Sequence, residues 1–330
     1  MAGKKIVILG GGFGGITAAQ ELRSALPAEH QVTLIDRSGR FMMGLRKLWM
    51  LVGRGTRQDG TRSLDALRAR GIDVRVATVS AIDPRARTVR TDAASVPFDY
   101  LIVALGAEPR PDLVSGFGPP AFNLYDADDV ERLAPRIRAF REGRILIAVM
   151  GVPYKCPPAP YEAAMMLDDL FRKRGLRDAV RIDTSTPQPM SLPVVGATNC
   201  TQVEGYLSAR GISFSPNRKV MKVDGNTVVA EGGAVQADLL IGVPPHRPPA
   251  IIRESGLTMR GEWLAVDSAT LRTSVEGIYA VGDVVEIPTA NAMALPKAGI
   301  FAEAQARVAA SQIMSEVMHR PAPTVFDGRG

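Results

Sequence analysis

Near its start the chain reads IVILGGGFGG at residues 6–15, an apolar segment followed directly by a run of glycines. Four aliphatic residues bounded by glycine predict a buried strand, and the pattern over residues 14–26 predicts an amphipathic helix behind it. Gly10 permits a tight turn, Gly12 lets the backbone approach a pyrophosphate, and Gly15 allows close packing of helix on strand. The segment therefore predicts a strand–turn–helix unit that binds a dinucleotide.

The next predicted strand, residues 31–35, adds an acidic residue to this site. It ends beside Asp36, whose carboxylate is suited to accept a ribose hydroxyl and disfavours a 2′-phosphate. N–H groups at the start of the helix face the phosphates, helped by the helix dipole. A glycine turn without a ligand accounts for the glycines but not for the acid at this spacing. The cofactor residues predicted here are Gly10, Gly12, Phe13, Gly14, Gly15, Asp36 and Arg37.

Composition bounds the remaining possibilities. The chain has 330 residues, a net charge of +6 and 46% hydrophobic residues, which suggests two globular units. Its basic residues are scattered, so no nucleic-acid-binding face is expected. No apolar run is long enough to span a membrane. Two cysteines and three separated histidines predict neither a disulfide framework nor a metal site, and the absence of an export signal predicts a cytoplasmic location.

Strand-like and helix-like patterns alternate along the chain, which predicts an α/β fold with parallel sheets. The polar stretch 116–120 and the proline-rich stretch 244–249 divide it, and the prolines of the second stretch are expected to prevent regular strand pairing. Further expected strands are 100–104, 145–150 and 277–281, and further expected helices are 127–141, 162–174 and 296–318. Near residues 236–243 the chain runs apolar into the proline-rich stretch.

Two later segments resemble the FAD-binding half of the pyridine nucleotide-disulfide oxidoreductase superfamily. Residues 99–107 read DYLIVALGA, and residues 270–273 (TLRT) are followed by GIYAVGD at 277–283. The resemblance implies two Rossmann-like domains and FAD as the cofactor, with Asp283 on the ribityl chain. It implies that residues 1–115 and 246–330 form the FAD domain and residues 116–245 the second domain. It also adds cofactor residues Ala104, Gly106, Gly282 and Asp283.

The segment where a second dinucleotide would bind carries prolines instead of glycines. Residues 151–162 read GVPYKCPPAPYE, and prolines lack the N–H donors that hold a pyrophosphate, so NADH is not the expected electron donor. Cys156 follows a predicted strand and precedes a helix, beside Lys155. This position is expected to lower the pKa of the thiol. Cys200 is expected to be a buried small hydrophobic residue.

The run CPPAPYE at residues 156–162 resembles the active-site loop of sulfide:quinone oxidoreductases and flavocytochrome c sulfide dehydrogenases. The resemblance implies that Cys156 lies over the flavin and carries sulfur as a persulfide or polysulfide. VPPHR at 243–247 resembles a flavin-side loop, in which His246 is either a proton shuttle or a surface histidine. LPKAG at 295–299 resembles a helix start at which Lys297 stabilises a reduced flavin, the alternative being an exposed lysine.

Other residues near this loop have two interpretations each. Glu162 is either a proton relay or an acid favoured in the first turn of a helix. Met42, Met43 and Met50, near Trp49, either line a channel for quinone or sulfur or simply fill the core, which is the commoner role of methionine.

The chain departs from the resembled family at two cysteines. Where an earlier cysteine is often found, this chain reads FNLY at residues 122–125. The second redox cysteine normally follows a segment like residues 325–330, where this chain stops. We therefore expect either a truncated C-terminal region, lacking the second cysteine and a membrane-docking segment, or a departure from the two-cysteine cycle.

The predicted function is oxidation of sulfide or another small sulfur species through Cys156, with electrons passing by FAD to a quinone. The alternatives are a type II NADH:quinone dehydrogenase-like flavoprotein and a redox-inert FAD-binding protein. A cytochrome partner, a homodimer and peripheral attachment to the inner membrane are further expectations.

Overall fold

The computed structural model describes residues 3–289, 293–321 and 324–329 and divides into two compact units. Unit 1 comprises residues 1–41, 62–108 and 247–330, and unit 2 comprises residues 42–61 and 109–246. Gly330, the last residue of the segment 325–330, lies outside the described residues. The main difference from the predicted boundaries is that residues 42–61 belong to unit 2. The physical reason is that Leu48 and Leu51 on helix α2 (Leu45–Leu51) are buried in the core of that unit.

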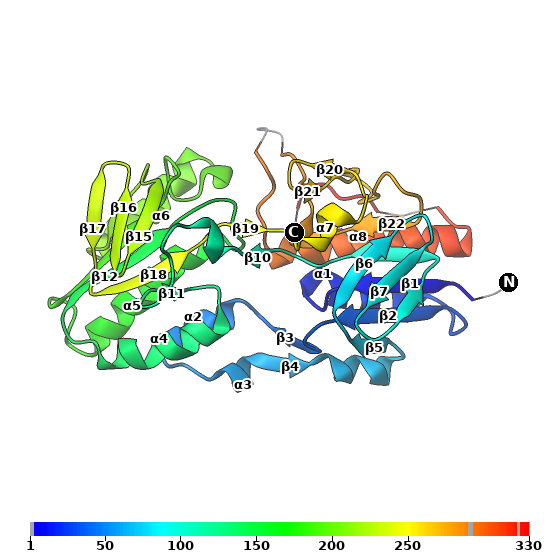
Figure 1. The fold of residues 1–330 in the computed structure, drawn as a ribbon, viewed down its shortest axis with the longest axis horizontal. Coiled ribbons are helices and arrows are strands. Elements are labelled where there is room, and N and C mark those ends of the chain that lie inside the picture. Colours follow the sequence, from blue (N-terminus) through cyan, green and yellow to red (C-terminus); the bar gives the residue numbers. More distant parts are fainter. Residues whose placement is uncertain (1–2, 290–292, 322–323, 330) are drawn as a thin grey trace. The chain divides into compact units, whose positions relative to one another are not determined.

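Unit 1 is built on a parallel five-stranded sheet with the order β22-β9-β1-β2-β5. Its β1 strand is apolar at four consecutive positions because both faces of a parallel sheet are covered. Helices α1 (Phe13–Ala25) and α8 (Gly299–Met318) pack against each other (Figure 1). The strands are β1 (Lys5–Leu9), β2 (Gln31–Asp36), β5 (Asp73–Val76), β9 (Tyr100–Val103) and β22 (Ile278–Ala280). The elements predicted from the sequence in this unit are confirmed apart from their end positions.

Smaller elements complete unit 1. They are the antiparallel sheet of β6 (Val79–Asp83), β7 (Thr88–Thr91) and β8 (Ser95–Pro97), the pair β20 (Met259–Arg260) and β21 (Trp263–Leu264), helix α7 (Ile251–Glu254), and the 3-10 helices η1 (Leu64–Arg70) and η4 (Gly282–Val284). Two short pairs form where the chain passes from one unit to the other: β3 (Arg40–Met42) with β4 (Thr61–Ser63), and β10 (Glu108–Pro109) with β19 (His246–Arg247).

Unit 2 contains a second parallel sheet, with the order β11-β18-β12-β13-β14. Its strands are β11 (Phe122–Asn123), β12 (Gly143–Val149), β13 (Val180–Ser185), β14 (Ser213–Ser215) and β18 (Leu239–Val243). Its helices are α2, α3 (Arg57–Gly60), α4 (Ala127–Ala139), α5 (Ala159–Lys173), α6 (Ala197–Ala209), and the 3-10 helices η2 (Pro111–Leu113) and η3 (Pro193–Val195). An antiparallel sheet is formed by β15 (Val220–Asp224), β16 (Thr227–Ala230) and β17 (Gly233–Gln236). Two parallel sheets flanked by helices confirm the predicted α/β, Rossmann-like fold class.

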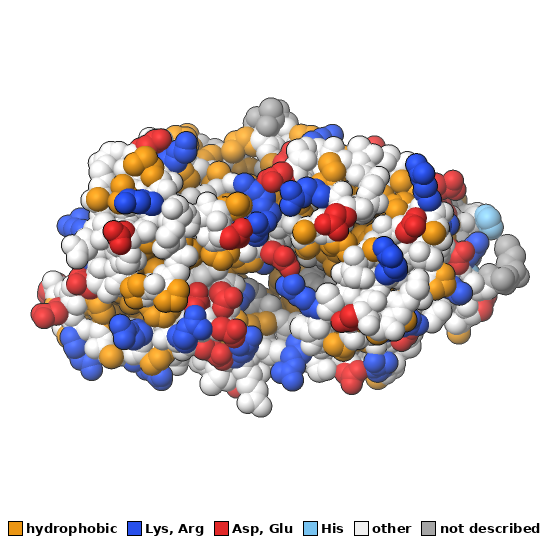
Figure 2. All heavy atoms as spheres, viewed as in Figure 1, with side chains coloured by type: hydrophobic (Ala, Val, Ile, Leu, Met, Phe, Trp, Pro, Cys, Tyr) orange, Lys and Arg blue, Asp and Glu red, His pale blue; other side chains and the backbone are white. Residues whose placement is uncertain are grey.

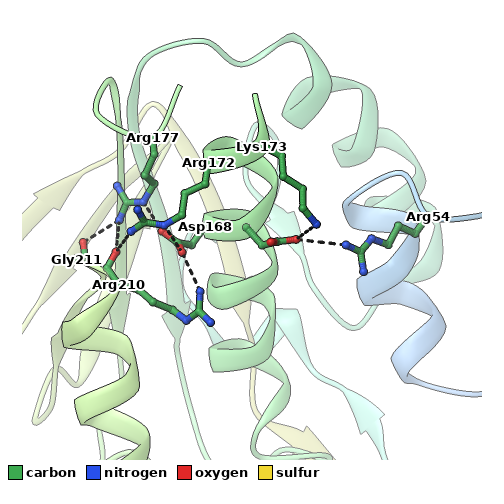
Figure 3. Close-up of polar contacts among 8 residues, drawn as sticks. Arg54, Asp168, Arg172, Lys173, Arg177, Arg210 and Gly211 are labelled. Atoms are coloured by element: carbon green, nitrogen blue, oxygen red, sulfur yellow. Dashed lines mark hydrogen bonds and ion pairs between the residues drawn. The ribbon is translucent and has the colours of Figure 1, made fainter. Parts of the chain in front are cut away.

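Helix α5 is anchored in unit 2 by Asp168, which Figure 3 shows among arginine side chains and whose own side chain is fully buried. Its oxygens accept hydrogen bonds from Nε of Arg172 at 2.9 Å, from Nη1 of Arg210 at 3.2 Å and from Nε of Arg177. Burial by itself raises the pKa of Asp168, but the hydrogen bonds from the three arginines outweigh it and lower this pKa below its usual value. The network therefore fixes the helix that directly follows the Cys156 loop.

One prediction about residues 244–249 was wrong. His246 and Arg247 form β19, although prolines stand on both sides of them. The N–H of His246 donates to the carbonyl oxygen of Pro153 at 2.7 Å. The two non-proline residues keep their N–H donors, and these are enough for a short paired segment.

The described residues also limit the kinds of site present. On the face in view in Figure 2, basic and acidic side chains are interspersed. Within residues 3–289, 293–321 and 324–329, no group of three or more His, Cys, Asp or Glu is arranged to hold a metal ion. Across the same described ranges, no helix combines the length and apolar character needed to cross a bilayer.

Candidate functional site

The glycine turn after β1 has the geometry that a pyrophosphate needs. Gly10 has a φ of +100°, and a Cβ added there would lie 2.3 Å from the carbonyl oxygen of Ala104. A Cβ on Gly15 would lie 1.8 Å from the carbonyl oxygen of Gly10, so glycine is required where α1 approaches β1. A Cβ on Gly12, the N-cap of α1, would meet nothing within 4 Å. This open space lies at the helix end whose N–H groups have no acceptor within the helix, which is where an anion binds.

Asp36 is fixed at the end of β2 by the surrounding turn. Its Oδ2 accepts a hydrogen bond from the N–H of Gly11 at 2.8 Å, and its Oδ1 accepts from the N–H groups of Ser38 at 2.8 Å and Gly39 at 3.0 Å. Among the described residues Oδ2 accepts a single bond, so a second lone pair is available for a ribose hydroxyl. Arg37, also predicted to bind the cofactor, pairs with Glu108 at 2.7 Å on an exposed surface of unit 1.

The later FAD segments gather around the same turn in unit 1. A Cβ on Gly14 would lie 3.1 Å from Cγ2 of Val281, the residue before Gly282. A Cβ on Gly299, the first residue of α8, would lie 2.7 Å from the ring of Phe13. Ala104 lies against Gly10 as described above, and Gly106 follows it with a φ of +67°. The structure therefore brings together three segments that are far apart in the sequence.

Lys297 lies two residues before Gly299, and its ammonium group has three contacts among the described residues. Nζ donates to the carbonyl oxygens of Asp283 at 2.8 Å and Val285 at 3.1 Å, and it lies 3.3 Å from the ring centroid of Trp263. Burial lowers the pKa of Lys297 to about 8, against the opposing charges of Asp283 and Glu286. The side chain is 7% exposed, so the alternative of an exposed lysine is wrong.

The residues of unit 1 fit an FAD. A small pocket in the same unit is lined by Gly282, Asp283, Pro296, Lys297, Ala298 and Gln305, and by Ala302, whose carbonyl oxygen would lie 3.5 Å from a Cβ on Gly14. An open helix N-terminus, a carboxylate with a spare lone pair and a buried cation supply the contacts that a pyrophosphate, a ribose and an electron-rich ring require. These residues would hold FAD, which supplies two-electron redox chemistry when bound.

The loop between β12 and α5 of unit 2 holds Cys156 in an unusual backbone conformation. Cys156 has a φ of +51°, in the left-handed region that non-glycine residues rarely adopt. Its carbonyl oxygen accepts hydrogen bonds from the N–H of Ala159 and from the hydroxyl of Tyr125, both at 3.0 Å. Cys200, in contrast, is 2% exposed on α6, as predicted.

His246 is buried against the same tyrosine. Its ring meets that of Tyr125 edge to face, with centroids 4.9 Å apart. Nδ1 lies 3.1 Å from the carbonyl oxygen of Pro244, which can only accept, so the neutral ring carries its proton on Nδ1 and its basic lone pair on Nε2. His246 is fully buried, so the alternative of a surface histidine is wrong.

Glu162 stands in the first turn of α5, one turn beyond the cysteine loop. Its Oε2 is buried and has no hydrogen-bond partner among the described residues. Burial raises the pKa of Glu162, which favours its neutral, proton-carrying form. Both predicted roles, proton relay and helix-start acid, are compatible with this position.

Sequence reasoning missed Lys47, which lies on α2 in the same unit. Helix α2 packs against α4 and α5, and Leu48 and Tyr154 belong to one hydrophobic core. Burial lowers the pKa of Lys47 to about 8; the neighbouring charge of Lys155 lowers it further, while that of Cys156 opposes the shift. A basic group beside the cysteine is thus supplied from a distant part of the sequence, and no motif around Lys47 signals it.

The three methionines near Lys47 have different environments. Met50 is 4% exposed and lies in the core of unit 2, as predicted, and Met42 is half-buried against that core. Met43 is 43% exposed, so its prediction as core filling was wrong. It precedes α2, at a position outside the hydrophobic core of unit 2.

Comparison with known proteins agrees with this arrangement. The family model for pyridine nucleotide-disulphide oxidoreductases matches residues 4–310. The chain is 26% identical to the mitochondrial sulfide:quinone oxidoreductase of Dictyostelium discoideum, over 98% of this chain and 73% of that protein. It is also 26% identical to the alternative NAD(P)H-ubiquinone oxidoreductase C1 of Arabidopsis thaliana, over 96% of this chain and 68% of that protein.

A solved structure of a sulfide:quinone oxidoreductase has a similar fold. The crystal structure of the sulfide:quinone oxidoreductase from Aquifex aeolicus matches with a TM-score of 0.86 and 25% identity. The match covers 96% of this chain and 78% of that one. With the FAD-binding geometry of unit 1, these findings show that the chain belongs to the pyridine nucleotide-disulphide oxidoreductase family and is an FAD-dependent oxidoreductase.

Proposed function

We propose that this protein oxidises sulfide at Cys156 and passes the electrons through FAD to a quinone. The observation that carries the proposal is the Cys156 loop: a cysteine in a left-handed conformation, joined through Tyr125 to a buried imidazole. The Cys156 loop follows β12, at the position where a nicotinamide-binding member needs glycines and free N–H donors. The similarity to sulfide:quinone oxidoreductases from two organisms supports the same conclusion.

The proposed sulfur step is a two-electron oxidation and therefore requires a two-electron acceptor. The thiolate of Cys156 and one hydrosulfide ion form an S–S bond, giving a Cys156 persulfide anion, one proton and two electrons. An FAD held by the residues of unit 1 would supply the two-electron acceptor, and a quinone would take the electrons from it. Nε2 of His246, the basic nitrogen of its neutral tautomer, is the proposed proton acceptor, and Glu162 is a proposed relay.

The main competing function is reduction of quinone by NADH, which the name of the Arabidopsis relative makes a specific alternative. The loop geometry argues against it. The N-cap of α5 is Pro158, which provides no N–H donor, and Pro157 and Pro160 stand on either side. A Cβ on Gly151, the glycine of this loop, would lie 2.9 Å from the ring of Pro245, so this glycine packs against protein instead of opening space for a phosphate.

Anaerobic titration of the purified FAD-loaded protein tests the proposal. We expect sulfide to bleach the visible absorbance of the oxidised flavin and NADH to leave it unchanged, and we expect a soluble quinone analogue to restore it. Cys156→Ser should abolish bleaching by sulfide while retaining FAD. Cys200→Ser, which changes the buried cysteine of the same unit, is the matched control and should behave as the parent protein.

Three results would overturn the proposal. Bleaching by NADH but not by sulfide would assign the NADH:quinone alternative. If neither donor bleaches the flavin, or if Cys156→Ser is bleached as fast as the parent, the cysteine has no role in the redox chemistry. Sedimentation with liposomes and with a cytochrome c preparation would test the proposed membrane and cytochrome partners, and gel filtration the proposed homodimer.

A further inference from the structure

Tyr125 lies in the segment, residues 122–125, where the resembled family often has a cysteine and this chain has none. It follows β11 and precedes Asp126, whose carboxylate caps α4 by accepting from the N–H groups of Asp128 and Asp129. The N–H of Tyr125 donates to Oδ1 of Asn123 at 2.9 Å. Its backbone is therefore fixed by a cap on one side and a side-chain hydrogen bond on the other.

The phenol of Tyr125 acts as a hydrogen-bond donor at every physiological pH. Burial raises the pKa of Tyr125 well above its usual value of 10.0, and the nearby Tyr154 and Cys156 add to the effect. The hydroxyl therefore stays protonated and donates a hydrogen bond to the carbonyl oxygen of Cys156 at 3.0 Å. This bond holds the peptide unit of a residue whose left-handed φ of +51° persists only where the surroundings enforce it.

The ring of Tyr125 has a second contact, with the imidazole of His246. The two rings meet at 83° with centroids 4.9 Å apart, the edge-to-face geometry that aromatic pairs prefer. His246 is held from its other side by Nδ1 and its backbone N–H, which bond to carbonyl oxygens of Pro244 and Pro153. One side chain thus touches both groups of the proposed sulfur chemistry.

We propose that Tyr125 is a positioning residue, whose hydroxyl sets the backbone of Cys156 and whose ring sets the orientation of His246. This inference rests on the proposed function, because it assigns to those two groups the sulfur-carrying and proton-accepting roles. Tyr161 offers a matched comparison in the same unit. It is a buried tyrosine whose hydroxyl also donates to a backbone carbonyl at 3.0 Å, but to Ser191, outside the cysteine loop.

The first test measures the reactivity of the Cys156 thiol without sulfide or quinone. In the Cys200→Ala background the chain has a single thiol, because it contains two cysteines in all. The rate of alkylation by iodoacetamide is followed by intact-protein mass spectrometry across a range of pH. In Tyr125→Phe we expect the midpoint of this pH profile to shift, because the backbone that orients the thiol is no longer held by the hydroxyl. At neutral pH we expect the rate to fall about fivefold, the equivalent of the roughly 1 kcal/mol of one hydrogen bond.

Tyr161→Phe should leave both the midpoint and the neutral rate of the parent. A Tyr125→Phe profile that overlays the parent profile would overturn the proposal, and so would an equal shift in Tyr161→Phe, since a general loss of packing would then suffice. If Tyr125→Phe shows its shift while sulfide fails to bleach the flavin, Tyr125 still positions the cysteine and the proposed function alone has failed.

The second test examines His246 by NMR and does not depend on the thiol. The chain contains three histidines, so the ring signals of His246 can be assigned by loss in His246→Gln. Tyr125→Leu should change the chemical shifts of these signals, because the aromatic ring that contacts the imidazole is removed. Tyr125→Phe keeps that ring and should largely preserve the chemical shifts. Unchanged His246 signals in Tyr125→Leu would refute the part of the proposal that concerns the imidazole.

Discussion

Replacing Asp168 by asparagine should destabilise unit 2 locally, around the helix that follows the cysteine loop. The carboxylate has no exposed surface and accepts hydrogen bonds from three arginines. Removing one partner of a buried ion pair costs about 3–5 kcal/mol because charges are left uncompensated. Arg172 and Arg210 are about half exposed and can be hydrated again, whereas Arg177 is 14% exposed. We therefore expect the lower end of that range, about 3 kcal/mol.

The neighbouring residue provides the control. Asp169 lies on the same helix and pairs with Lys173 at 2.8 Å and Arg54 at 3.2 Å, but it is 44% exposed. Exposed pairs contribute about 1 kcal/mol at most, so Asp169→Asn should have little effect. Because the chain has two units, unfolding need not be two-state, and native-state hydrogen exchange is the suitable measurement.

For Asp168→Asn, amides of α5 and β13 that exchange through opening of unit 2 should exchange about a hundredfold faster at neutral pH, and those of unit 1 should not change. The effect should depend on pH in a defined direction. Because the pKa of Asp168 is lowered in the folded protein, its stabilising contribution is present above the unfolded value of about 3.9 and is lost as pH falls through the folded pKa. Equal exchange rates in the Asp168→Asn and Asp169→Asn variants would refute this reasoning.

The remaining predictions concern the cofactor turn and the two lysines of lowered pKa. Gly12→Ala should weaken FAD binding about tenfold or more but leave the melting temperature of the apoprotein nearly unchanged, because its Cβ fills only the open space at the N-cap. Gly15→Ala should lower both the affinity for FAD and the melting temperature, because its Cβ meets the carbonyl oxygen of Gly10. FAD fluorescence titration and thermal unfolding distinguish the two. Lys47→Met should raise resistance to urea at about pH 7, because the buried ammonium of Lys47 disfavours folding of the parent. The parent gains stability as pH rises from about 8 towards 10.5, so the difference in stability between the variant and the parent should shrink over that range. Lys297→Met should lower the midpoint potential of the flavin in spectroelectrochemical titration, because a buried cation is lost, and an unchanged potential would exclude the proposed role of this lysine.

The sequence was sufficient to predict the elements whose signals are local. β1, β2, β9 and β12 are apolar runs bounded by glycine or acidic residues, and the glycine spacing predicted the turn at Gly10 and Gly15 because steric contacts leave no alternative there. The prolines after β12 likewise identified the Cys156 loop, since they remove donors whatever the tertiary fold.

The parts that were not predicted depend on contacts between distant segments. Lys47 lies on a short helix with no motif, and only its packing on α4 and α5 brings it near Cys156. Tyr125 was noted only as part of a segment lacking a cysteine, because a hydroxyl-to-carbonyl bond leaves no trace in the sequence. The burial of His246 and Lys297 also follows from tertiary packing, which is why exposed alternatives stayed open for both.

The order of strands in unit 1 has a consequence for biosynthesis. β9 lies between β1 and β22, and β22 is encoded far downstream, after the whole of unit 2. While the ribosome is still translating that intervening stretch, the nascent chain displays one side of β9 with unsatisfied backbone groups, the type of edge that promotes aggregation. We therefore expect the nascent chain to depend on chaperones during this interval and to misfold faster when translation stalls before Ile278. Both effects follow because one sheet is assembled from strands encoded at the two ends of the coding sequence.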